Sequence, residues 1–583
     1  MKVLLVQPPY PFSEFPKPSW ALMSLGAVLR QQGTEVKVLD LLSTRYAPRK
    51  IEECLSLFQP DLIGATCVTM NFSSTVKILQ YCKALSPQST TLMGGPHVTF
   101  TAVQTLNDYP EVDIIARGEG ELTLRELTLA LDQGGDLRGV KGLSFRSHGT
   151  IQQTEDRPWI TDLNTIPLPD RTLFPLARYL AMRVPASVLT SRGCPTGCSF
   201  CVGYRMTGRR GRFRDPLRVV DEMETARALG FEEICIDDDL FTRNRGHVFR
   251  ICEEIGRRGL KGKMYLFARV DTVDAILLRK LRDAGCAMIC FGMESGNQGI
   301  LDRAHKRTTL EKTRQAVQMS KDAGISPFGS FILGLPGETR ETVEETVSFA
   351  RSLGIPYGFH LLSPFPGTRI REKATEYGIK ILTDDWSLYD ADHAVTETES
   401  LRASEVENVA KSFFQNLGAE IEKMKRETLA GTYAGPYREE MEKRLEVELA
   451  WKILSGDLVE EQGEISPLRE WPSGENENPL RFLARRIISR APTWNWFHLP
   501  ASSVSNPAIS SRLRSSYWCC RCRPRTTTGP TKTCAGTWGS TRTRGCRCTG
   551  KRGAMRSKFR CRLAGWNALI LPGSLWIPTS GPN

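Results

Sequence analysis

The feature that most constrains this fold is a repeated alternation of short apolar runs with longer amphipathic stretches. Such alternation is typical of a parallel β-sheet covered by helices. Up to residue 117 the strand-like runs are KVLLVQ, EVKVLDL, DLIGATC, TTLMGG and VDIIAR. We predict a doubly wound, Rossmann-like α/β domain over residues 1–150. Ligands of such sheets bind at the carboxyl ends of the strands, which here carry the loops QPPYPF, CVTMNF, GGPHVTF and RGEGE.

The alternation resumes at residue 186, after a hairpin-like stretch and a proline-bearing segment that we interpret as a linker over residues 151–185. Six strand-like runs follow: SVLTSR, EEICID, KMYLFAR, AMICFG, FGSFILG and YGFHLL. A closed barrel of this type needs about eight βα units. The sequence therefore predicts a partial (β/α)6 barrel with one open side over residues 186–400. Residues 401–460 are helical in pattern and highly charged, and predict a small C-terminal helical domain.

The net charge of +13 is concentrated at the end of the chain. Residues 501–583 hold 15 of the 78 Lys and Arg residues, seven of the 17 cysteines and no Asp or Glu, so the first 500 residues carry 63 basic and 65 acidic groups. This tail could be a nucleic-acid-binding arm, a cysteine-rich metal module or non-native sequence from a shifted reading frame, and its abrupt change in composition favours the last. We expect residues 461–583 to be disordered and assign no function to residues 501–583.

Because the first 500 residues are nearly neutral, we expect no nucleic-acid partner. No run approaches the roughly 18 to 20 apolar residues of a membrane span, and the first apolar stretch is too short for a secretory signal. We therefore expect no integral membrane segment and a cytoplasmic location.

Three cysteines lie within eight residues in the segment CPTGCSFC: Cys194, Cys198 and Cys201. The Pro, Thr, Gly and Ser residues among them predict a loop, which argues against three core cysteines. A closed zinc site needs a fourth ligand. A cubane iron–sulfur cluster held by three cysteines leaves one iron open to a chelating small molecule. We therefore predict that these cysteines ligate a 4Fe–4S cluster, and that their thiols are reduced in the cytoplasm.

This C-x3-C-x2-C spacing, with Phe200 before the last cysteine and at the first strand of a six-unit partial barrel, resembles the radical S-adenosylmethionine superfamily. The resemblance implies that S-adenosylmethionine binds the open iron and is cleaved to a 5′-deoxyadenosyl radical. It also implies cofactor contacts from the ends of the second, fourth and fifth strands, namely Asp237, Asp239, Glu294, Ile332 and Gly334.

Each of these matches has another interpretation. The acidic triplet that contains Asp237 could cap the helix that follows it, and Gly334 could simply shape a turn. Arg269 could neutralise a carboxylate or form a surface ion pair. The basic run TGRRGRFR, with Arg209, Arg210, Arg212 and Arg214, could meet an acidic substrate or reductant, although a solvated face is favoured.

The Rossmann-like domain ahead of the barrel resembles the cobalamin-binding branch of the same superfamily. Gly94 and Gly95 in GGPHVTF would let the backbone approach a bulky nucleotide tail. No G-x-G-x-x-G follows the first strand, which argues against NAD or FAD. No histidine precedes His97, so the cobalt-ligating D-x-H-x-x-G loop is absent, and His97 is expected to meet the nucleotide tail or cap a helix.

This pair of cofactors suits methyl transfer to an unactivated carbon or phosphorus centre, which needs both a radical and a methyl donor. The layout also resembles the anaerobic magnesium-protoporphyrin monomethyl ester cyclase, including LSPFPGTRI and DDWSLYDADHAV, so oxidative cyclisation is the alternative. A non-catalytic cobalamin or redox sensor is a third. The resemblance implies a small-molecule substrate and a low-potential electron donor such as flavodoxin or ferredoxin.

Overall fold

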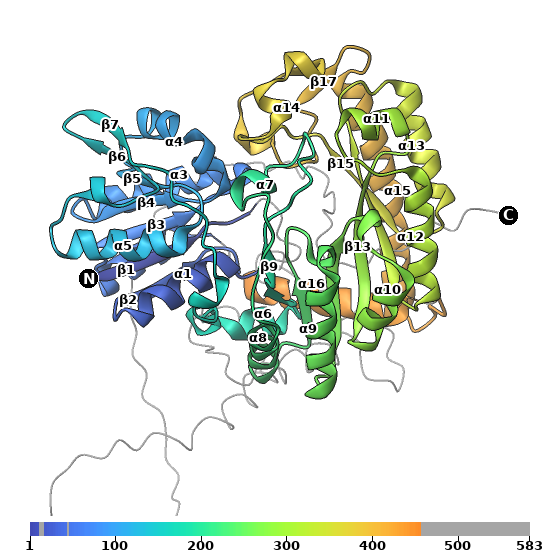
Figure 1. Ribbon diagram of the computed structural model, residues 1–583, viewed down its shortest axis with the longest axis horizontal. Helices are drawn as coiled ribbons and strands as arrows, with labels where there is room; N and C mark the ends of the chain where they lie inside the picture. Colours follow the sequence, from blue (N-terminus) through green and yellow to red (C-terminus); the bar gives the residue numbers. More distant parts are fainter. Residues whose placement is uncertain (11–16, 44–45, 436, 456–583) are drawn as a thin grey trace, which may run out of the picture. The chain divides into compact units, whose positions relative to one another are not determined.

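The computed structural model describes residues 1–10, 17–43, 46–435 and 437–455. Residues 2–153 contain a seven-stranded sheet in the order β2-β1-β3-β4-β5-β6-β7 (Figure 1). The first five strands pair in parallel, and the last two form an antiparallel hairpin at one edge. The strands are β1 (Lys2–Gln7), β2 (Glu35–Asp40), β3 (Leu62–Thr66), β4 (Thr90–Gly94), β5 (Ile114–Ala116), β6 (Leu143–Ser147) and β7 (Thr150–Gln153).

This strand order confirms the predicted doubly wound class and places the topological switch point between β1 and β3. The helices of the layer are α1 (Trp20–Gln31), α2 (Pro48–Phe58), α3 (Phe72–Leu85), α4 (Pro96–Asp108) and α5 (Gly120–Asp132). Helix α1 begins where the Ser19 hydroxyl accepts a hydrogen bond from the Leu22 amide. It ends before Gly33, whose φ of 87° is the left-handed conformation expected of a C′ glycine.

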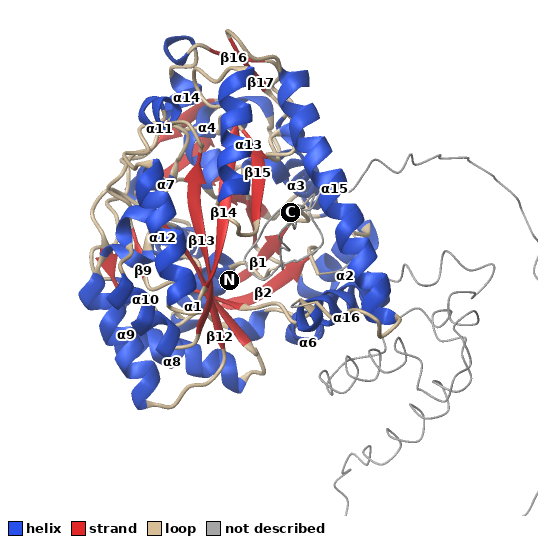
Figure 2. Cartoon of the chain, turned by 90° about the vertical axis from the view of Figure 1, so that its right-hand side faces the viewer, coloured by secondary structure: helices blue, strands red, loops and turns tan. Residues whose placement is uncertain are grey.

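The second sheet has six parallel strands in the order β15-β14-β13-β12-β11-β8 and does not close (Figure 2). This confirms the partial barrel. Its strands are β8 (Ala186–Val188), β11 (Glu233–Ile236), β12 (Lys263–Ala268), β13 (Cys286–Glu294), β14 (Ser326–Leu333) and β15 (Tyr357–Leu361). Its helices are α8 (Pro216–Ala228), α9 (Arg245–Arg257), α10 (Ala275–Asp283), α11 (Gln298–Arg303), α12 (Leu310–Asp322) and α13 (Arg340–Ser352).

The segment between the sheets contains short helical turns and α6 (Leu176–Ala181), and the barrel is followed by α14 (Arg369–Glu372) and a small hairpin of β16 (Ile379–Ile381) and β17 (Thr396–Thr398). Two long helices come last, α15 (Ala403–Leu429) and α16 (Arg438–Ser455). Helix α15 packs against the edge strand β15, where Phe413 stacks on Tyr357 with ring centroids 5.1 Å apart. The helix therefore adds aromatic packing to the strand at this edge of the sheet.

Within the described residues, no helix combines the length and the apolar character that crossing a membrane requires. The predictions for residues 461–583 lie outside the described part of the chain.

Candidate functional site

The three predicted cluster ligands lie on one loop that leaves the barrel after its first strand. Two short strands, β9 (Ser191–Arg192) and β10 (Arg212–Phe213), pair in antiparallel fashion and close residues 193–211, which we call the cluster loop. The loop includes helix α7 (Gly203–Met206). The amide and hydroxyl of Ser199 both donate to the Ala304 carbonyl, at 3.0 and 3.1 Å. The loop is therefore anchored to the barrel next to its central cysteine.

The cysteine side chains are held by neighbours from the loop and the barrel. The Gly203 amide donates to Cys201 Sγ at 3.3 Å, and Arg269 Nη1 donates to Cys198 Sγ at 3.7 Å. Burial, followed by the nearby thiols of the other two cysteines, raises the pKa of Cys201 to about 12 despite the Gly203 hydrogen bond. Among the described His, Cys, Asp and Glu residues, no three converge on a single ion position. Three thiols on one loop match the donor set of a cubane cluster that leaves one iron open.

A cavity of about 270 Å³ opens at the carboxyl ends of the barrel strands, where barrel enzymes place their chemistry. It adjoins the cluster loop through Asp239 and Arg269. Its other polar lining residues are Cys290, Lys306, Ser330 and His360. The cavity therefore joins the cluster loop to the barrel interior.

The acidic triplet follows β11, and its three carboxylates have different partners. Asp239 accepts hydrogen bonds from the Gly193 amide at 2.8 Å and the Thr207 hydroxyl at 2.6 Å, so it braces the cluster loop. Asp237 pairs with Lys17 Nζ at 3.4 Å. Asp238 is buried against residues 190–191, and burial raises its pKa to about 6. The capping alternative is wrong, because Asn244 caps α9.

Glu294, at the end of β13, forms a buried ion pair that the sequence did not reveal. Its Oε1 lies 2.6 Å from Lys306 Nζ, and its backbone is left-handed with a φ of 68°. Lys306 is flanked by two further left-handed residues, His305 and Arg307. Such backbone in non-glycine residues is uncommon and concentrates at functional sites. The run AHKRTT carries no turn signal that would have predicted it.

Arg269 and part of the basic run are buried, in contrast to the surface interpretations. Arg269 makes two bonds of 2.9 Å to Asp271 and donates to the Lys306 carbonyl at 2.6 Å, so it is no surface ion pair. Arg212 and Arg214 are also buried and pair with carboxylates. The solvated-face interpretation is therefore wrong for these two, whereas Arg209 and Arg210 are exposed.

The fifth-strand motif combines a turn with a buried acid. Ile332 and Phe200 pack against the same hydrophobic cluster, next to the cluster loop. Gly334 has a φ of 89°, and its amide donates to Glu338 Oε2 at 2.6 Å. Glu338 is fully buried, and its Oε1 has no partner in the described part of the chain. Contact of Ile332 and Gly334 with adenine stays a prediction.

The buried carboxyl group of Glu338 should make the stability of the fold depend on pH. Burial raises its pKa to about 8 from an ordinary value of 4.5, so the folded chain keeps a proton that the unfolded chain releases. Stability from this group is present below about pH 4.5 and is lost as the pH rises towards 8. We expect Glu338→Gln to gain stability over the wild type by about 1.4 kcal/mol per pH unit between pH 5 and 8. Urea unfolding at three pH values measures the difference in unfolding free energy between the variant and the wild type. A difference that does not change with pH would contradict the prediction.

The two glycines at the end of β4 have different surroundings. A Cβ on Gly95, whose φ is 109°, would lie 2.3 Å from the Cys67 carbonyl oxygen, so this glycine admits the chain's own backbone. A Cβ on Gly94 would have its nearest neighbour at 3.7 Å, in ordinary contact. The predicted approach of a nucleotide tail stays a prediction for both residues.

His97 is buried in the core of the first domain. Its ring stacks on Phe72 at 4.2 Å and meets the edge of Trp386 at 4.8 Å, and Nδ1 lies 3.2 Å from the Thr69 hydroxyl. Burial and the nearby Arg371 lower its pKa to about 3, so the ring is neutral. The helix-cap alternative is wrong, because His97 lies inside α4, whose N-cap residue is Gly95 and which has no side-chain cap. Trp386 brings the DDWSLYDADHAV segment onto this domain, which the sequence did not indicate.

The chain matches known proteins over both domains. Sequence profiles of the B12 binding domain and the radical SAM superfamily match residues 14–128 and 188–350. An uncharacterized methyltransferase of Pyrococcus horikoshii is 33% identical over 422 residues, which cover 71% of this chain and 92% of that protein. The anaerobic magnesium-protoporphyrin IX monomethyl ester cyclase of Rubrivivax gelatinosus is 31% identical over 408 residues, which cover 67% of this chain and 72% of that protein.

A solved structure shares the fold: the radical S-adenosylmethionine methyltransferase TsrM from Kitasatospora setae, with cobalamin and a 4Fe–4S cluster bound. The TM-score is 0.58 at 23% identity, and the match covers 70% of this chain and 84% of that one. The two profiles confirm the cofactors predicted from the sequence, a 4Fe–4S cluster, S-adenosylmethionine and cobalamin. A cysteine loop beside a barrel cavity, a preceding B12-type domain and a relative matched over nearly its whole length show that the chain is an enzyme of the radical S-adenosylmethionine superfamily, in the branch with a B12-binding domain.

Proposed function

We propose that this enzyme methylates an unactivated carbon or phosphorus centre of a small molecule. The observation that carries the proposal is the continuity of the cluster loop with the barrel cavity through Asp239 and Arg269, in a chain that also has a B12-binding domain. When bound, S-adenosylmethionine and the 4Fe–4S cluster supply a carbon-centred radical and cobalamin supplies a methyl group. The names of relatives such as the Pyrococcus methyltransferase support methyl transfer.

The chain's own residues bind and orient these groups. In this proposal the thiols of Cys194, Cys198 and Cys201 hold the cluster, and Arg269 places a positive charge between Cys198 and the cavity. Asp237, Asp239 and Glu294 stand at the strand ends around S-adenosylmethionine, with Ile332 and Gly334 beside its adenine. Gly94, Gly95 and His97 lie in the first domain at the edge expected to meet cobalamin.

The proposed division of labour follows the two sheets. Residues 1–150 bind cobalamin, 151–185 link the domains, 186–400 form the radical barrel and 401–460 add the helical C-terminal part. The chemistry consumes electrons, so we propose a low-potential donor such as flavodoxin or ferredoxin, and a cytoplasmic location in which the thiols stay reduced.

Oxidative cyclisation is the second candidate, because the Rubrivivax cyclase matches at 31% identity. Product analysis separates the two reactions. A methylase forms 5′-deoxyadenosine and S-adenosylhomocysteine together, whereas a cyclase forms the first without a stoichiometric amount of the second.

The test begins with the full chain purified without air and reconstituted with iron, sulfide and hydroxocobalamin. We expect about four iron atoms and one cobalt per chain. Incubation with S-adenosylmethionine carrying a deuterated methyl group and candidate small molecules should then move the label into a product. Iron without cobalt would overturn both candidate reactions, and label that never reaches a product would overturn methylation.

A further inference from the structure

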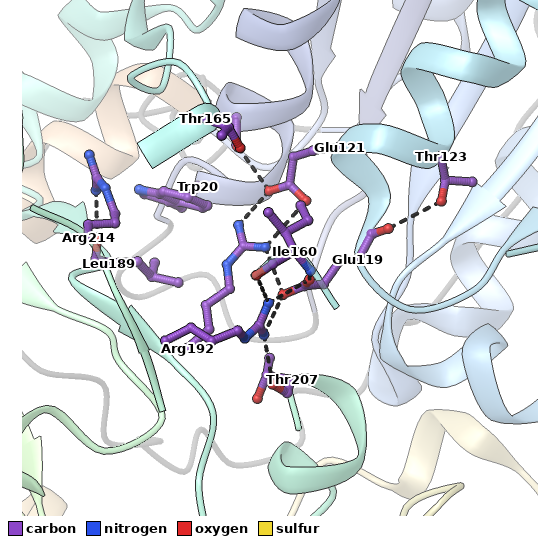
Figure 3. Close-up of polar contacts among 12 residues, drawn as sticks. Trp20, Glu119, Glu121, Thr123, Ile160, Thr165, Leu189, Arg192, Thr207 and Arg214 are labelled. Atoms are coloured by element: carbon purple, nitrogen blue, oxygen red, sulfur yellow. Dashed lines mark hydrogen bonds and ion pairs between the residues drawn. The ribbon is translucent and has the colours of Figure 1, made fainter. Parts of the chain in front are cut away.

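One carboxylate of the first domain holds both ends of the cluster loop. Arg192 on β9 stands opposite Arg212 on β10 at the base of the loop. Both guanidinium groups bind Glu119, the residue just before α5. Figure 3 labels Glu119 and its partner Arg192. Arg212 Nη1 and Nη2 lie 2.9 and 2.7 Å from the two oxygens of Glu119, and Arg192 Nη1 lies 3.0 Å from Oε1. The loop that carries the three cysteines is thus closed by a side chain from outside the barrel.

This contact is buried and balanced in charge. The side chains of Glu119, Arg192 and Arg212 are 6%, 9% and 8% exposed. Glu121, 6% exposed, pairs with Arg192 and accepts a hydrogen bond from the Ser24 hydroxyl at 3.0 Å. Two carboxylates therefore face two guanidinium groups. Removing one partner of such a buried group leaves an uncompensated charge that the surroundings must accommodate.

The remaining bonds of Glu119 fix its own position. Its Oε2 accepts a hydrogen bond from the Ile160 amide at 2.8 Å, and Arg212 Nη1 donates to the Ile160 carbonyl at 2.6 Å. The linker segment therefore completes the site, and the carboxylate cannot turn away from the arginines without losing a backbone partner.

A residue of the barrel also binds the cluster loop, independently of Glu119. Asp239 binds the Gly193 amide at one end of the loop and the Thr207 hydroxyl towards the other. The loop is thus held from two sides, by Asp239 of the barrel and Glu119 of the first domain. Loss of the Glu119 contact should loosen the cysteines without unfolding the barrel strands.

We infer that Glu119 is a positioning residue for the iron–sulfur cluster. The first domain contributes this carboxylate, which acts on the cluster loop through Arg192 and Arg212. The inference rests on the proposed cluster at Cys194, Cys198 and Cys201. It gives the first domain a second task, because the domain also keeps the cluster loop in the geometry that retains iron. The same carboxylate belongs to the RGEGE segment, whose glutamates bind the two arginines that flank the cluster loop.

The experiment measures iron release from the full, reconstituted chain to a coloured iron chelator without air. We expect Glu119→Gln to release iron at least ten times faster than the wild type while its bound cobalamin is unchanged. Glu126→Gln is the control. Glu126 lies in α5, whose N-cap residue is Glu119, and the change removes its ion pair with Arg157 without touching the cluster loop. Its iron release should equal that of the wild type.

Glu119→Asp keeps the charge on a shorter side chain and should release iron at a rate between those of the wild type and Glu119→Gln. If Glu119→Gln does not fold, the rate of Glu119→Asp tests the inference. Wild-type rates in the Glu119 variants that fold would overturn the inference. Equal acceleration in Glu126→Gln would overturn it too, since the effect would then be general loosening. A wild-type chain that binds no iron would instead overturn the proposed cluster site.

Discussion

Replacing Cys198 with alanine is expected to lower the iron content of the reconstituted chain from about four atoms to near zero. Cys198 is the buried, central member of the three thiols, and its sulfur is the one that Arg269 contacts. Two remaining thiols leave a cubane cluster with too few protein ligands. Cleavage of S-adenosylmethionine to 5′-deoxyadenosine should fall below detection with the iron. Colorimetric iron analysis and the electron paramagnetic resonance signal of the reduced cluster measure the loss.

Cys252→Ala is the matched control for this change. Cys252 is also buried, but it lies in α9 and not on the cluster loop. This variant should keep the iron content and the resonance signal of the wild type. Four iron atoms per chain in Cys198→Ala would show that the cluster is held elsewhere.

Replacing Lys306 with methionine is expected to lower the free energy of unfolding by about 3 to 5 kcal/mol, the usual cost of stranding one partner of a buried ion pair. The Lys306 and Glu294 side chains are 6% and 9% exposed, so loss of the ammonium group leaves the Glu294 carboxylate poorly solvated. Urea unfolding of the chain without cofactors measures the effect. Methionine keeps most of the length of the side chain and removes the ammonium group that donates to Glu294.

The double variant Lys306→Met with Glu294→Met shows how much of the destabilisation comes from the lost ion-pair attraction. The rest comes from leaving the Glu294 carboxylate buried without a partner. Replacing both partners by apolar residues of similar volume is often neutral, so most of the lost stability should return. Lys373→Met, which removes the exposed pair with Glu376, should change the unfolding midpoint little because water screens that pair. A double variant as unstable as Lys306→Met would contradict this account of the ion pair.

The alternation of apolar runs was sufficient to predict both sheets, because parallel strands buried on two faces leave a continuous apolar signal. The cysteine spacing likewise predicted the cluster loop, since all three residues lie within one local segment. The partner of Asp237 could not be predicted in this way. Lys17 lies 220 residues away, and periodicity shows which face of a strand is buried but not which distant side chain meets its end.

In the acidic triplet, too, the sequence could not show which distant groups the side chains contact. Successive side chains after a strand point in different directions. Asp237, Asp238 and Asp239 therefore reach the first domain, residues 190–191 and the cluster loop. His97 was expected to meet a cofactor tail or cap a helix, but its sequence context could not show that Phe72 and Trp386 would enclose its ring. Such contacts are set by tertiary packing alone.

The closure of the cluster loop by Glu119 also bears on how such enzymes can be recombined. The carboxylate belongs to the first domain and the arginines belong to the barrel, so the domains are not interchangeable parts. A chimera that grafts a foreign first domain onto this barrel would need an acidic residue at the same place, or it would bury two arginines without a counter-charge. Shuffling in evolution would therefore have to carry the carboxylate and both arginines together, and a functional graft should include the linker that supplies Ile160.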